Sequence, residues 1–259
     1  MATHHSVTLD PGDARMSTSS CGKFVLAVPT LNEAGNIERL LKEVQRVLDP
    51  LNRPYEIVVV DDGSEDGTPD IVQRYADLDP RVRLLCRREE RGLAGAVLHG
   101  WNHSSGEVLG VIDADLQHPP DILPLLLESI DEGNDIAIGS RYVTKDGVAD
   151  WNPLRVAISR ASTWATLPLQ RKGVRIKDPM SGFFVVRRES VDGIEFESKG
   201  FKLLLEILVR GRIRSAREIP IHFGRRYAGK SKANLGVAFH YLHLLGKLSR
   251  DLFLRPSPQ

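Results

Sequence analysis

The chain has 259 residues, of which 41% are hydrophobic and 27% are charged. This is enough for one well-buried α/β domain, alone or with an appendage. Its net charge of +1, from 35 basic and 34 acidic residues, indicates no class of ligand. The only cysteines, Cys21 and Cys86, lie outside any C-x-x-C or zinc-type spacing. This argues against a disulfide framework or a structural zinc site and fits a reducing compartment.

The first 22 residues are rich in Ser, Thr, His and Asp and lack an apolar run. We therefore expect residues 1–22 to be disordered and not a signal peptide. Met16 is an alternative to Met1 as the true start. No stretch approaches the roughly 20 apolar residues that a membrane-spanning helix needs. Any contact with a membrane is therefore expected to be peripheral, or made through a partner.

Between residues 23 and 138, short apolar runs alternate with segments of helical periodicity. Strands are predicted at Lys23–Val28, Glu56–Val60, Val82–Cys86, Val108–Ile112 and Asp135–Ile138, and helices at Asn36–Leu48, Thr68–Tyr75, Leu93–Asn102 and Asp121–Glu132. This order is typical of an α/β fold with a mostly parallel sheet and helices on both faces. Ligands of such sheets bind beyond the carboxyl ends of the strands.

Asp113, Asp115 and Gln117 follow the fourth predicted strand at alternate positions. Two carboxylates and an amide oxygen at this spacing can converge on one hard cation, leaving room for diphosphate oxygens and water, as Mg²⁺ or Mn²⁺ prefers. Asp-x-Asp is also common in solvated turns, but this pair follows a strand end, and a second acidic strand end occurs at Asp61 and Asp62. We predict a divalent-metal site whose ion stabilises a leaving nucleotide diphosphate.

Glu33, Asp61 and Asp62 follow the first two predicted strands. Carboxylates at such positions can accept hydrogen bonds from ribose hydroxyls and base N–H groups. A local role is also compatible with the sequence, because the residues after Asp62 can form a turn and Asp66 can cap the next helix. We predict capping for Asp66 and ligand contact for Asp61 and Asp62.

A third set of residues is suited to phosphate. Arg141 follows a predicted strand, Arg155 and Ser159 are four residues apart on one helix face, and Arg226 lies near the end of the domain. The guanidinium fork can bind phosphate oxygens bidentately, and a serine hydroxyl can add a donor. Each residue alone is more often a solvated surface group, but together they favour a phosphate-binding cluster.

These motifs together resemble the dolichyl-phosphate (polyprenyl-phosphate) mannose synthases, which are family 2 glycosyltransferases of GT-A fold. The resemblance covers roughly Phe24 to Leu235, and the motifs occur in the expected order. They are Pro29-Thr30-Leu31-Asn32-Glu33, Asp61-Asp62-Gly63-Ser64, Asp113-Ala114-Asp115-Leu116-Gln117-His118-Pro119-Pro120, Gly139-Ser140-Arg141-Tyr142, Asp178-Pro179-Met180-Ser181-Gly182-Phe183-Phe184 and Lys199-Gly200-Phe201-Lys202.

The resemblance implies an inverting transfer of mannose from GDP-mannose to a polyprenyl (dolichyl) phosphate. It implies Mg²⁺ or Mn²⁺ at Asp113, Asp115 and Gln117, with Asp115, Arg141 and Arg226 as catalytic residues. The acceptor phosphate would lie on Arg141, Arg155, Ser159 and Arg226. The donor nucleotide would lie on Pro29, Thr30, Asn32, Glu33, Asp61, Asp62, Asp113 and Ala114. The catalytic domain is expected over residues 23–234.

The last quarter of the chain is strongly basic, with 13 basic and 3 acidic residues from Lys199 to Gln259. Leu235 to Phe253, projected at about 3.6 residues per turn, predicts an amphipathic helix with a mostly cationic polar arc. Residues 235–259 can lie in an anionic bilayer interface or pack on the domain. We predict the interface, which would place the enzyme in the cytoplasm, on the cytosolic face of a membrane. A membrane-anchoring subunit is a further possible partner.

Other functions remain compatible with parts of the sequence. A UDP-glucose-dependent polyprenyl-phosphate glucosyltransferase would share the fold and the mechanism. A nucleotidyltransferase would normally carry a Gly-rich, basic loop after its first strand, where this chain has Pro29-Thr30-Leu31-Asn32-Glu33. A non-catalytic nucleotide-binding module would not need a complete metal site. Nucleic acid is not expected as a partner.

Overall fold

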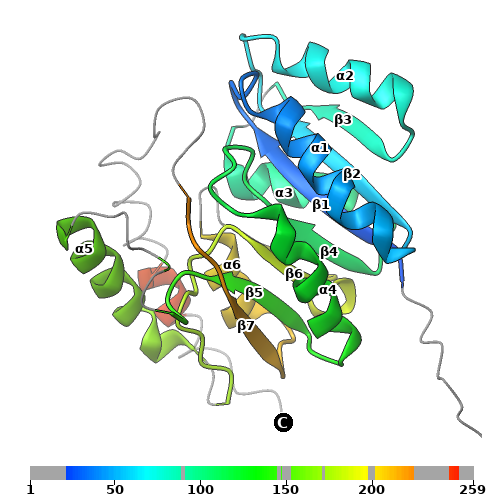
Figure 1. Cartoon of the computed structure of the whole chain (residues 1–259). Helices are drawn as coiled ribbons and strands as arrows, with labels where there is room; N and C mark the ends of the chain where they lie inside the picture. The colour runs from blue at the N-terminus through cyan, green and yellow to red at the C-terminus, as the bar shows by residue number, and fades with distance from the viewer. Residues whose placement is uncertain are drawn as a thin grey trace, which may run out of the picture.

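The computed structural model describes residues 22–88, 91–144, 147, 153–170, 173–197, 202–224 and 245–250. Within these residues, seven strands form one mixed sheet in the order β3-β2-β1-β4-β6-β5-β7 (Figure 1). The strands are β1 (Phe24–Thr30), β2 (Tyr55–Asp61), β3 (Val82–Cys86), β4 (Val108–Val111), β5 (Ile136–Ser140), β6 (Phe184–Arg187) and β7 (Ala216–Pro220). The helices are α1 (Ile37–Leu48), α2 (Thr68–Leu78), α3 (Leu93–Asn102), α4 (Leu123–Asp131), α5 (Pro153–Trp164) and α6 (Leu203–Arg210), and short 3-10 turns include η2 (Pro120–Ile122) and η4 (Leu167–Leu169).

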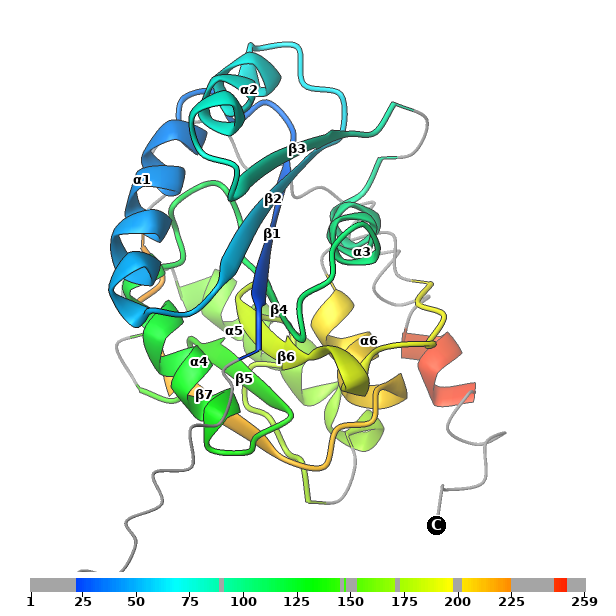
Figure 2. The same cartoon turned by 90° about the vertical axis from the view of Figure 1, so that its right-hand side faces the viewer.

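The sheet is covered on both faces, as predicted. Alternate residues of β1 point to opposite sides, so that Phe24 and Leu26 pack with α1, α2 and α4, while Val25 and Ala27 pack with α3 and α6. Figure 2 shows these helix layers on either side of the strands. Because both faces are buried, β1 and β2 are almost continuously apolar, which is why their sequences were easy to recognise as strands.

The predicted elements before residue 139 are confirmed, with ends shifted by a few residues. β1, β2, β3 and β4 pair in parallel, as the alternation of strands and helices indicated. These parallel strands end at one edge of the sheet. That edge carries the acidic motifs.

No strand is predicted after Ile138, but two further strands follow. β6 runs antiparallel between β4 and β5, and β7 pairs in parallel with β5. An antiparallel strand does not continue the alternation of parallel strands and helices, so that pattern gives no sign of β6. The helix predicted to carry Arg155 and Ser159 is present as α5, which has 12 residues.

The antiparallel strand β6 determines which residues lie between the ends of β4 and β5. β4 and β5 both run opposite to β6, so their carboxyl ends lie at the same edge, and β6 begins there. The residues just before Phe184 therefore enter the sheet between the end of β4 and the end of β5. These are the residues of the Asp-Pro-Met-Ser-Gly motif.

Part of the predicted tail helix packs on the domain. Residues 245–250 are helical, and Leu248 is fully buried beside Leu169, Leu205 and Val209. Lys247 forms an ion pair with Glu197. The predicted interface position is therefore wrong for Leu248, because the hydrophobic surface of the domain already covers it. The remainder of Leu235–Phe253, and residues 1–21, lie outside the described residues. Among the helices described, none has both the length and the apolar character to cross a bilayer.

Candidate active site

The turn after β2 is organised by Asp61. Its carboxylate accepts hydrogen bonds from the Thr30 hydroxyl (2.8 Å), the Ser64 hydroxyl (2.5 Å) and the backbone N–H groups of Gly63 (3.1 Å) and Ser64 (2.8 Å). Only 1% of Asp61 is exposed. The structure thus gives Thr30 and Asp61 a mutual contact that joins β1 to β2, and ligand contact by Asp61 stays a prediction.

Asp62 is turned toward the other side of the same loop. It accepts the N–H of Gly92 at the start of α3 (2.7 Å) and lies 3.2 Å from Nε of Arg87. Burial raises the pKa of this carboxyl, while the Gly92 N–H and the Arg87 charge oppose the rise. Asp62 therefore links the loop after β2 to the start of α3. Its contact with a nucleotide stays a prediction.

The loop after β1 is held against the loop after β2. Asn32, at a positive φ of 55°, donates its N–H to the Ser64 hydroxyl (2.7 Å) and accepts the N–H of Glu65 (2.9 Å). Glu33 accepts the side-chain amide of Asn36 (2.6 Å). Pro29 is half-buried at the end of the strand. The first two predicted donor-binding loops are therefore adjacent.

Asp66 contacts the start of α2 as predicted, but from the position before the N-cap, which is Gly67. Its carboxylate accepts the N–H and the hydroxyl of Thr68, the first residue of α2, at 3.1 and 2.5 Å, and also the N–H of Ala34 (2.9 Å). A carboxylate at this position satisfies donors that the first helical turn leaves open. Asp66 is accordingly a structural residue that also fixes the loop after β1.

The predicted cation site lies just beyond β4. Leu116 adopts a left-handed φ of 60°, a conformation that costs a non-glycine residue about 1–2 kcal/mol. Two hydrogen bonds hold this turn: Gly224 donates its N–H to the Gln117 carbonyl (2.9 Å), and Gln117 Nε2 donates to the Gly224 carbonyl (3.0 Å). The second bond uses the amide nitrogen and turns the amide oxygen of Gln117 away from Gly224. Asp115 accepts the Gln117 N–H (3.1 Å) and is 6% exposed, and Ala114 is buried beside it.

This donor set fits a magnesium-type cation that is shared with a ligand. Among the residues described, no three His, Cys, Asp or Glu side chains are arranged to hold a metal by themselves. Mg²⁺ is usually bound by one or two carboxylates together with substrate phosphates. Asp113, Asp115 and the oxygen of Gln117 match that incomplete set, which a diphosphate would complete.

His118 lies behind the cation site. Its ring contacts Phe183 and Phe223, with centroids 5.5 and 5.0 Å away, and its Nδ1 is 3.7 Å from Asp113 Oδ2. Burial, and then the charge of Arg141, lower the pKa of His118 to about 3. His118 is therefore neutral at physiological pH and brings no positive charge to the site.

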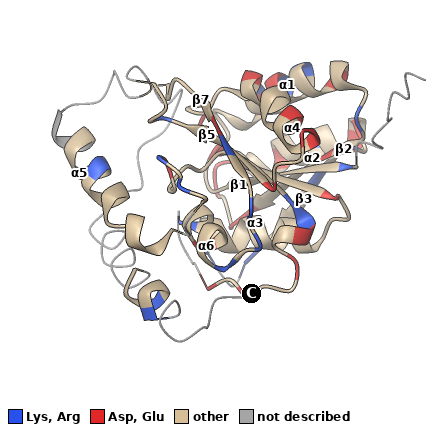
Figure 3. Ribbon diagram, turned by 90° about the horizontal axis from the view of Figure 1, so that it is seen from below, with Lys and Arg blue, Asp and Glu red and all other residues tan. Residues whose placement is uncertain are grey.

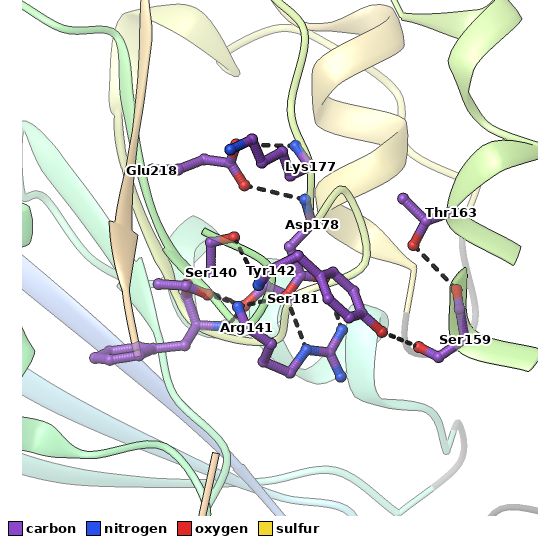
Figure 4. A network of polar contacts seen from close by, with 11 residues as sticks. Ser140, Arg141, Tyr142, Ser159, Thr163, Lys177, Asp178, Ser181 and Glu218 are labelled. Carbon is purple, nitrogen blue, oxygen red and sulfur yellow. Dashed lines mark hydrogen bonds and ion pairs between the residues drawn. The ribbon is translucent and has the colours of Figure 1, made fainter. Parts of the chain in front are cut away.

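Arg141 follows β5, and Asp178 holds it (Figure 4). Its Nε and Nη2 donate to the two carboxylate oxygens of Asp178, both at 2.7 Å, and its backbone N–H donates to the same side chain (3.0 Å). Asp178 is fully buried. One bidentate edge of the guanidinium is therefore already used, and the predicted bidentate contact of Arg141 with a phosphate would have to use the other edge.

Helix α5 reaches this corner through Tyr142, whose hydroxyl donates to the Ser159 hydroxyl (2.5 Å). Ser159, a member of the predicted phosphate-binding cluster, is thus linked to the residue next to Arg141. Arg155 belongs to α5, but its side chain lies outside the described residues, as does Arg226. Tyr142 had no predicted role, although its position next to Arg141 marked it.

Lys202, which had no predicted role, is a second cation near Arg141. It precedes α6, and burial, followed by the charge of Arg141, lowers the pKa of Lys202 to about 8, while Asp178 opposes that change. The pKa of Arg141 is raised: burial lowers it, but the hydrogen bonds and charge of Asp178, with a smaller contribution from Asp113, together outweigh the burial. Asp113 and Arg141 follow β4 and β5, whose carboxyl ends lie on either side of the start of β6 at one edge of the sheet.

Comparisons with known proteins identify the family of the chain. The model of the family "Glycosyl transferase family 2" matches residues 25–194. A dolichol-phosphate mannosyltransferase of Pyrococcus furiosus is 42% identical over 228 residues, which cover 88% of this chain and 64% of that protein's length. The corresponding enzyme of Saccharomyces cerevisiae is 34% identical over 236 residues, covering 87% and 86%. A polyprenol monophosphomannose synthase of Mycolicibacterium smegmatis is 36% identical over 220 residues, covering 81% and 80%.

Solved structures support the fold. Glucosyl-3-phosphoglycerate synthase from Mycobacterium tuberculosis, in complex with Mn²⁺, UDP and glucosyl-3-phosphoglycerate, superimposes with a TM-score of 0.66 at 17% identity, covering 91% of this chain and 82% of that one. At this identity the likeness concerns the α/β GT-A-like fold alone. Together with the sequence relatives, it confirms the predicted fold class. The chain belongs to glycosyl transferase family 2, in the group formed by the dolichol-phosphate mannosyltransferases and polyprenol monophosphomannose synthases.

Proposed function

We propose that the protein transfers mannose from GDP-mannose to a polyprenyl (dolichyl) phosphate with inversion, giving a β-mannosyl phosphoryl lipid and GDP. The observation that carries the proposal is that acidic residues and an arginine lie at the same edge of the sheet. Asp113, Asp115 and Gln117, which form an incomplete cation site, follow β4, and Arg141 follows β5, on the other side of β6 at the same edge of the sheet. The names of the sequence relatives support mannose as the sugar and a polyprenyl phosphate as the acceptor.

The cofactor of this proposal is Mg²⁺ or Mn²⁺, held by Asp113, Asp115 and the amide oxygen of Gln117. When bound, the ion would neutralise charge that develops on the leaving nucleotide diphosphate. The adjacent loops after β1 and β2 would hold the nucleotide. Their candidate contacts are Pro29, Thr30, Asn32, Glu33, Asp61, Asp62, Asp113 and Ala114.

The acceptor phosphate needs no general base, because it is already anionic at neutral pH. Its oxygen would attack the anomeric carbon from the side opposite to GDP. The task of the protein is to bring two negatively charged reactants together in line, so positioning and charge stabilisation must supply the rate. Arg141, Arg155, Ser159 and Arg226 are the proposed acceptor contacts, with Asp115, Arg141 and Arg226 as the catalytic residues.

A lipid acceptor requires contact with a membrane, and one surface of the domain supports the proposed peripheral position on a cytosolic face. Trp164 and Leu167, at the end of α5 and in η4, are 70% and 41% exposed. The sequence of α5 has two arginines and no acidic residue, and Figure 3 shows no acidic colour on this helix. Exposed aromatic and aliphatic side chains next to basic ones suit an anionic bilayer interface. A membrane-anchoring subunit would be compatible with the same surface.

A single transfer assay tests the proposed function. The full chain is incubated with Mn²⁺, polyprenyl phosphate in vesicles and either radiolabelled GDP-mannose or radiolabelled UDP-glucose. We expect labelled lipid from GDP-mannose alone. Labelled lipid from UDP-glucose alone would support the rival glucosyltransferase, and the absence of labelled lipid with both donors would refute transfer to a lipid phosphate.

A further inference from the structure

The segment Asp178–Gly182 lies between the two corners of the active site. It leads into β6, which starts between the ends of β4 and β5. Asp113 follows β4, and Arg141 follows β5. The segment therefore has one proposed ligand-binding residue on each side.

The first end of the segment holds Arg141. Asp178 binds the guanidinium through two 2.7 Å hydrogen bonds and is itself fully buried. Glu218 on β7 fixes the segment in turn, because its carboxylate accepts the backbone N–H groups of Lys177 (2.9 Å) and Asp178 (3.0 Å) (Figure 4). Both the Asp178 side chain and its backbone are thus held.

The middle of the segment is fastened to β5. The Ser181 hydroxyl donates to the Gly139 carbonyl (2.7 Å) and accepts the N–H of Phe183 (3.2 Å). Gly139 in turn donates its N–H to the Phe183 carbonyl (2.9 Å). These bonds leave the segment little freedom to slide along the edge of the sheet.

The last residue of the segment touches the cation site. A Cβ atom added to Gly182 would lie 2.8 Å from Asp113 Oδ2, closer than van der Waals contact allows. Gly182 therefore leaves room for the Asp113 carboxylate where a larger residue would displace it. The Asp113 carboxylate can rotate about its side-chain bonds. A larger residue in place of Gly182 would therefore move this carboxylate without unfolding the domain.

We propose that Asp178–Gly182 is a positioning element that sets the placement of Arg141 relative to the cation site. Asp178 orients Arg141 toward the acceptor phosphate, and Gly182 allows Asp113 to face the donor. In-line transfer depends on this spacing, since a misplacement of about 1 Å can cost a factor of about 10² in rate. This inference rests on the proposed acceptor role of Arg141.

A purely electrostatic role of the Asp178 carboxylate predicts the opposite effect on acceptor binding. A buried carboxylate beside Arg141 repels an incoming phosphate, so neutralising it would strengthen acceptor binding if Asp178 acted only through its charge. If Asp178 orients the guanidinium, Asp178→Asn should raise KM for polyprenyl phosphate by at least about tenfold and leave the affinity for GDP with Mn²⁺ unchanged. Gly182→Ala should do the reverse, with weaker binding of GDP with Mn²⁺ and an unchanged acceptor KM.

The test measures both quantities in the full chain, with GDP and Mn²⁺ followed by isothermal titration and KM by transfer with saturating GDP-mannose. Glu206→Gln is the matched control: Glu206 is also fully buried and pairs with an arginine, Arg210 (3.0 Å), on α6. It should lower the melting temperature and leave acceptor KM unchanged. If Asp178→Asn fails to bind GDP, the comparison is made with Glu218→Gln, which weakens the support of Asp178 without removing the ion pair.

Three results separate the possibilities. A raised acceptor KM in Asp178→Asn with a selective loss of GDP affinity in Gly182→Ala supports the positioning element. An unchanged or lowered acceptor KM in Asp178→Asn, or equal changes of both quantities in either variant, overturns it. If Arg141→Ala also leaves the acceptor KM unchanged, the proposed acceptor site itself is wrong, which distinguishes that failure from a failure of the positioning role.

Discussion

The two corners of the active-site edge are built in different ways. On the acidic side, Asp113, Asp115 and Gln117 lie within five consecutive positions just after β4, and Asp115 accepts the backbone N–H of Gln117 (3.1 Å). On the cationic side, Arg141 depends on Asp178, 37 residues away in the chain, and Asp178 depends on Glu218, a further 40 residues away. Local sequence therefore specifies the acidic corner, whereas tertiary structure assembles the cationic one.

The largest expected effect comes from the acidic corner. Asp115→Ala should lower transfer by roughly 10³-fold or more, about 4 kcal/mol of activation free energy, because it removes one of two carboxylates from the cation site. The fold should survive, since Asp115 lies in the turn after β4, outside the hydrophobic core clusters, and its removal creates no core cavity. Asp121→Ala is the control, because its side chain is 63% exposed and forms a surface ion pair with Arg46. Near wild-type turnover of Asp115→Ala at saturating Mn²⁺ would refute the cation site.

Arg141→Lys probes the cationic corner. We expect a loss of about 10²-fold in kcat/KM for the acceptor, because an ammonium group cannot reproduce the two-pronged contact with Asp178. Arg53→Lys is a suitable control, since Arg53 also contacts both carboxylate oxygens of an aspartate, Asp131, at 3.0 and 3.1 Å. Steady-state kinetics at varied acceptor and varied donor locate the effect. A change confined to the donor would move Arg141 to the nucleotide site.

A smaller effect should appear with pH. The pKa of Lys202 is lowered to about 8, so this side chain is charged below pH 8 and loses its charge as the pH rises through that value. Acceptor KM should therefore rise above about pH 8, by up to about tenfold, while GDP affinity stays constant. Lys202→Arg, which remains charged, should remove that rise. Identical pH profiles for the two proteins would show that Lys202 does not contribute to acceptor binding.

The tail should have the smallest effect on chemistry. Leu248→Ala removes a fully buried side chain from a small hydrophobic cluster and should lower stability by about 2–3 kcal/mol or release the terminal helix. Lys247→Ala breaks a partly exposed ion pair and should cost about 1 kcal/mol or less. Transfer to a short, water-soluble polyprenyl phosphate should persist in both variants. Thermal denaturation and that assay together check the prediction, and loss of soluble transfer in Lys247→Ala would contradict it.

The same contrast explains what could be predicted from the sequence. The parallel strands were evident because β1 and β2 are almost continuously apolar, and the cation site was evident because its three residues lie within five positions. β6 was missed although it is as long as β4, because it runs antiparallel and does not continue the alternation of parallel strands and helices. The role of Asp178 was missed because its partner lies on another strand end, and no local spacing connects the two. Lys202 stood in a recognised motif, but only the fold brings it near Arg141.

The tail shows the limit of periodicity in another way. An amphipathic pattern predicts that one face is buried, but it does not say whether lipid or protein buries it. Leu248 packs on the domain, next to α6. The exposed Trp164 and Leu167 lie on the neighbouring surface after α5, where periodicity alone gave no reason to prefer them.

The central claim is that the two corners bind different reactants, and one paired measurement tests it most directly. Binding of GDP with Mn²⁺ is measured by isothermal titration for Asp115→Ala and Arg141→Ala, alongside KM for polyprenyl phosphate in the transfer assay with Arg141→Ala. We predict that Asp115→Ala loses GDP binding, and that Arg141→Ala binds GDP normally with a strongly raised acceptor KM. Loss of GDP binding in Arg141→Ala, or normal Mn²⁺-dependent GDP binding in Asp115→Ala, would contradict the division of the site.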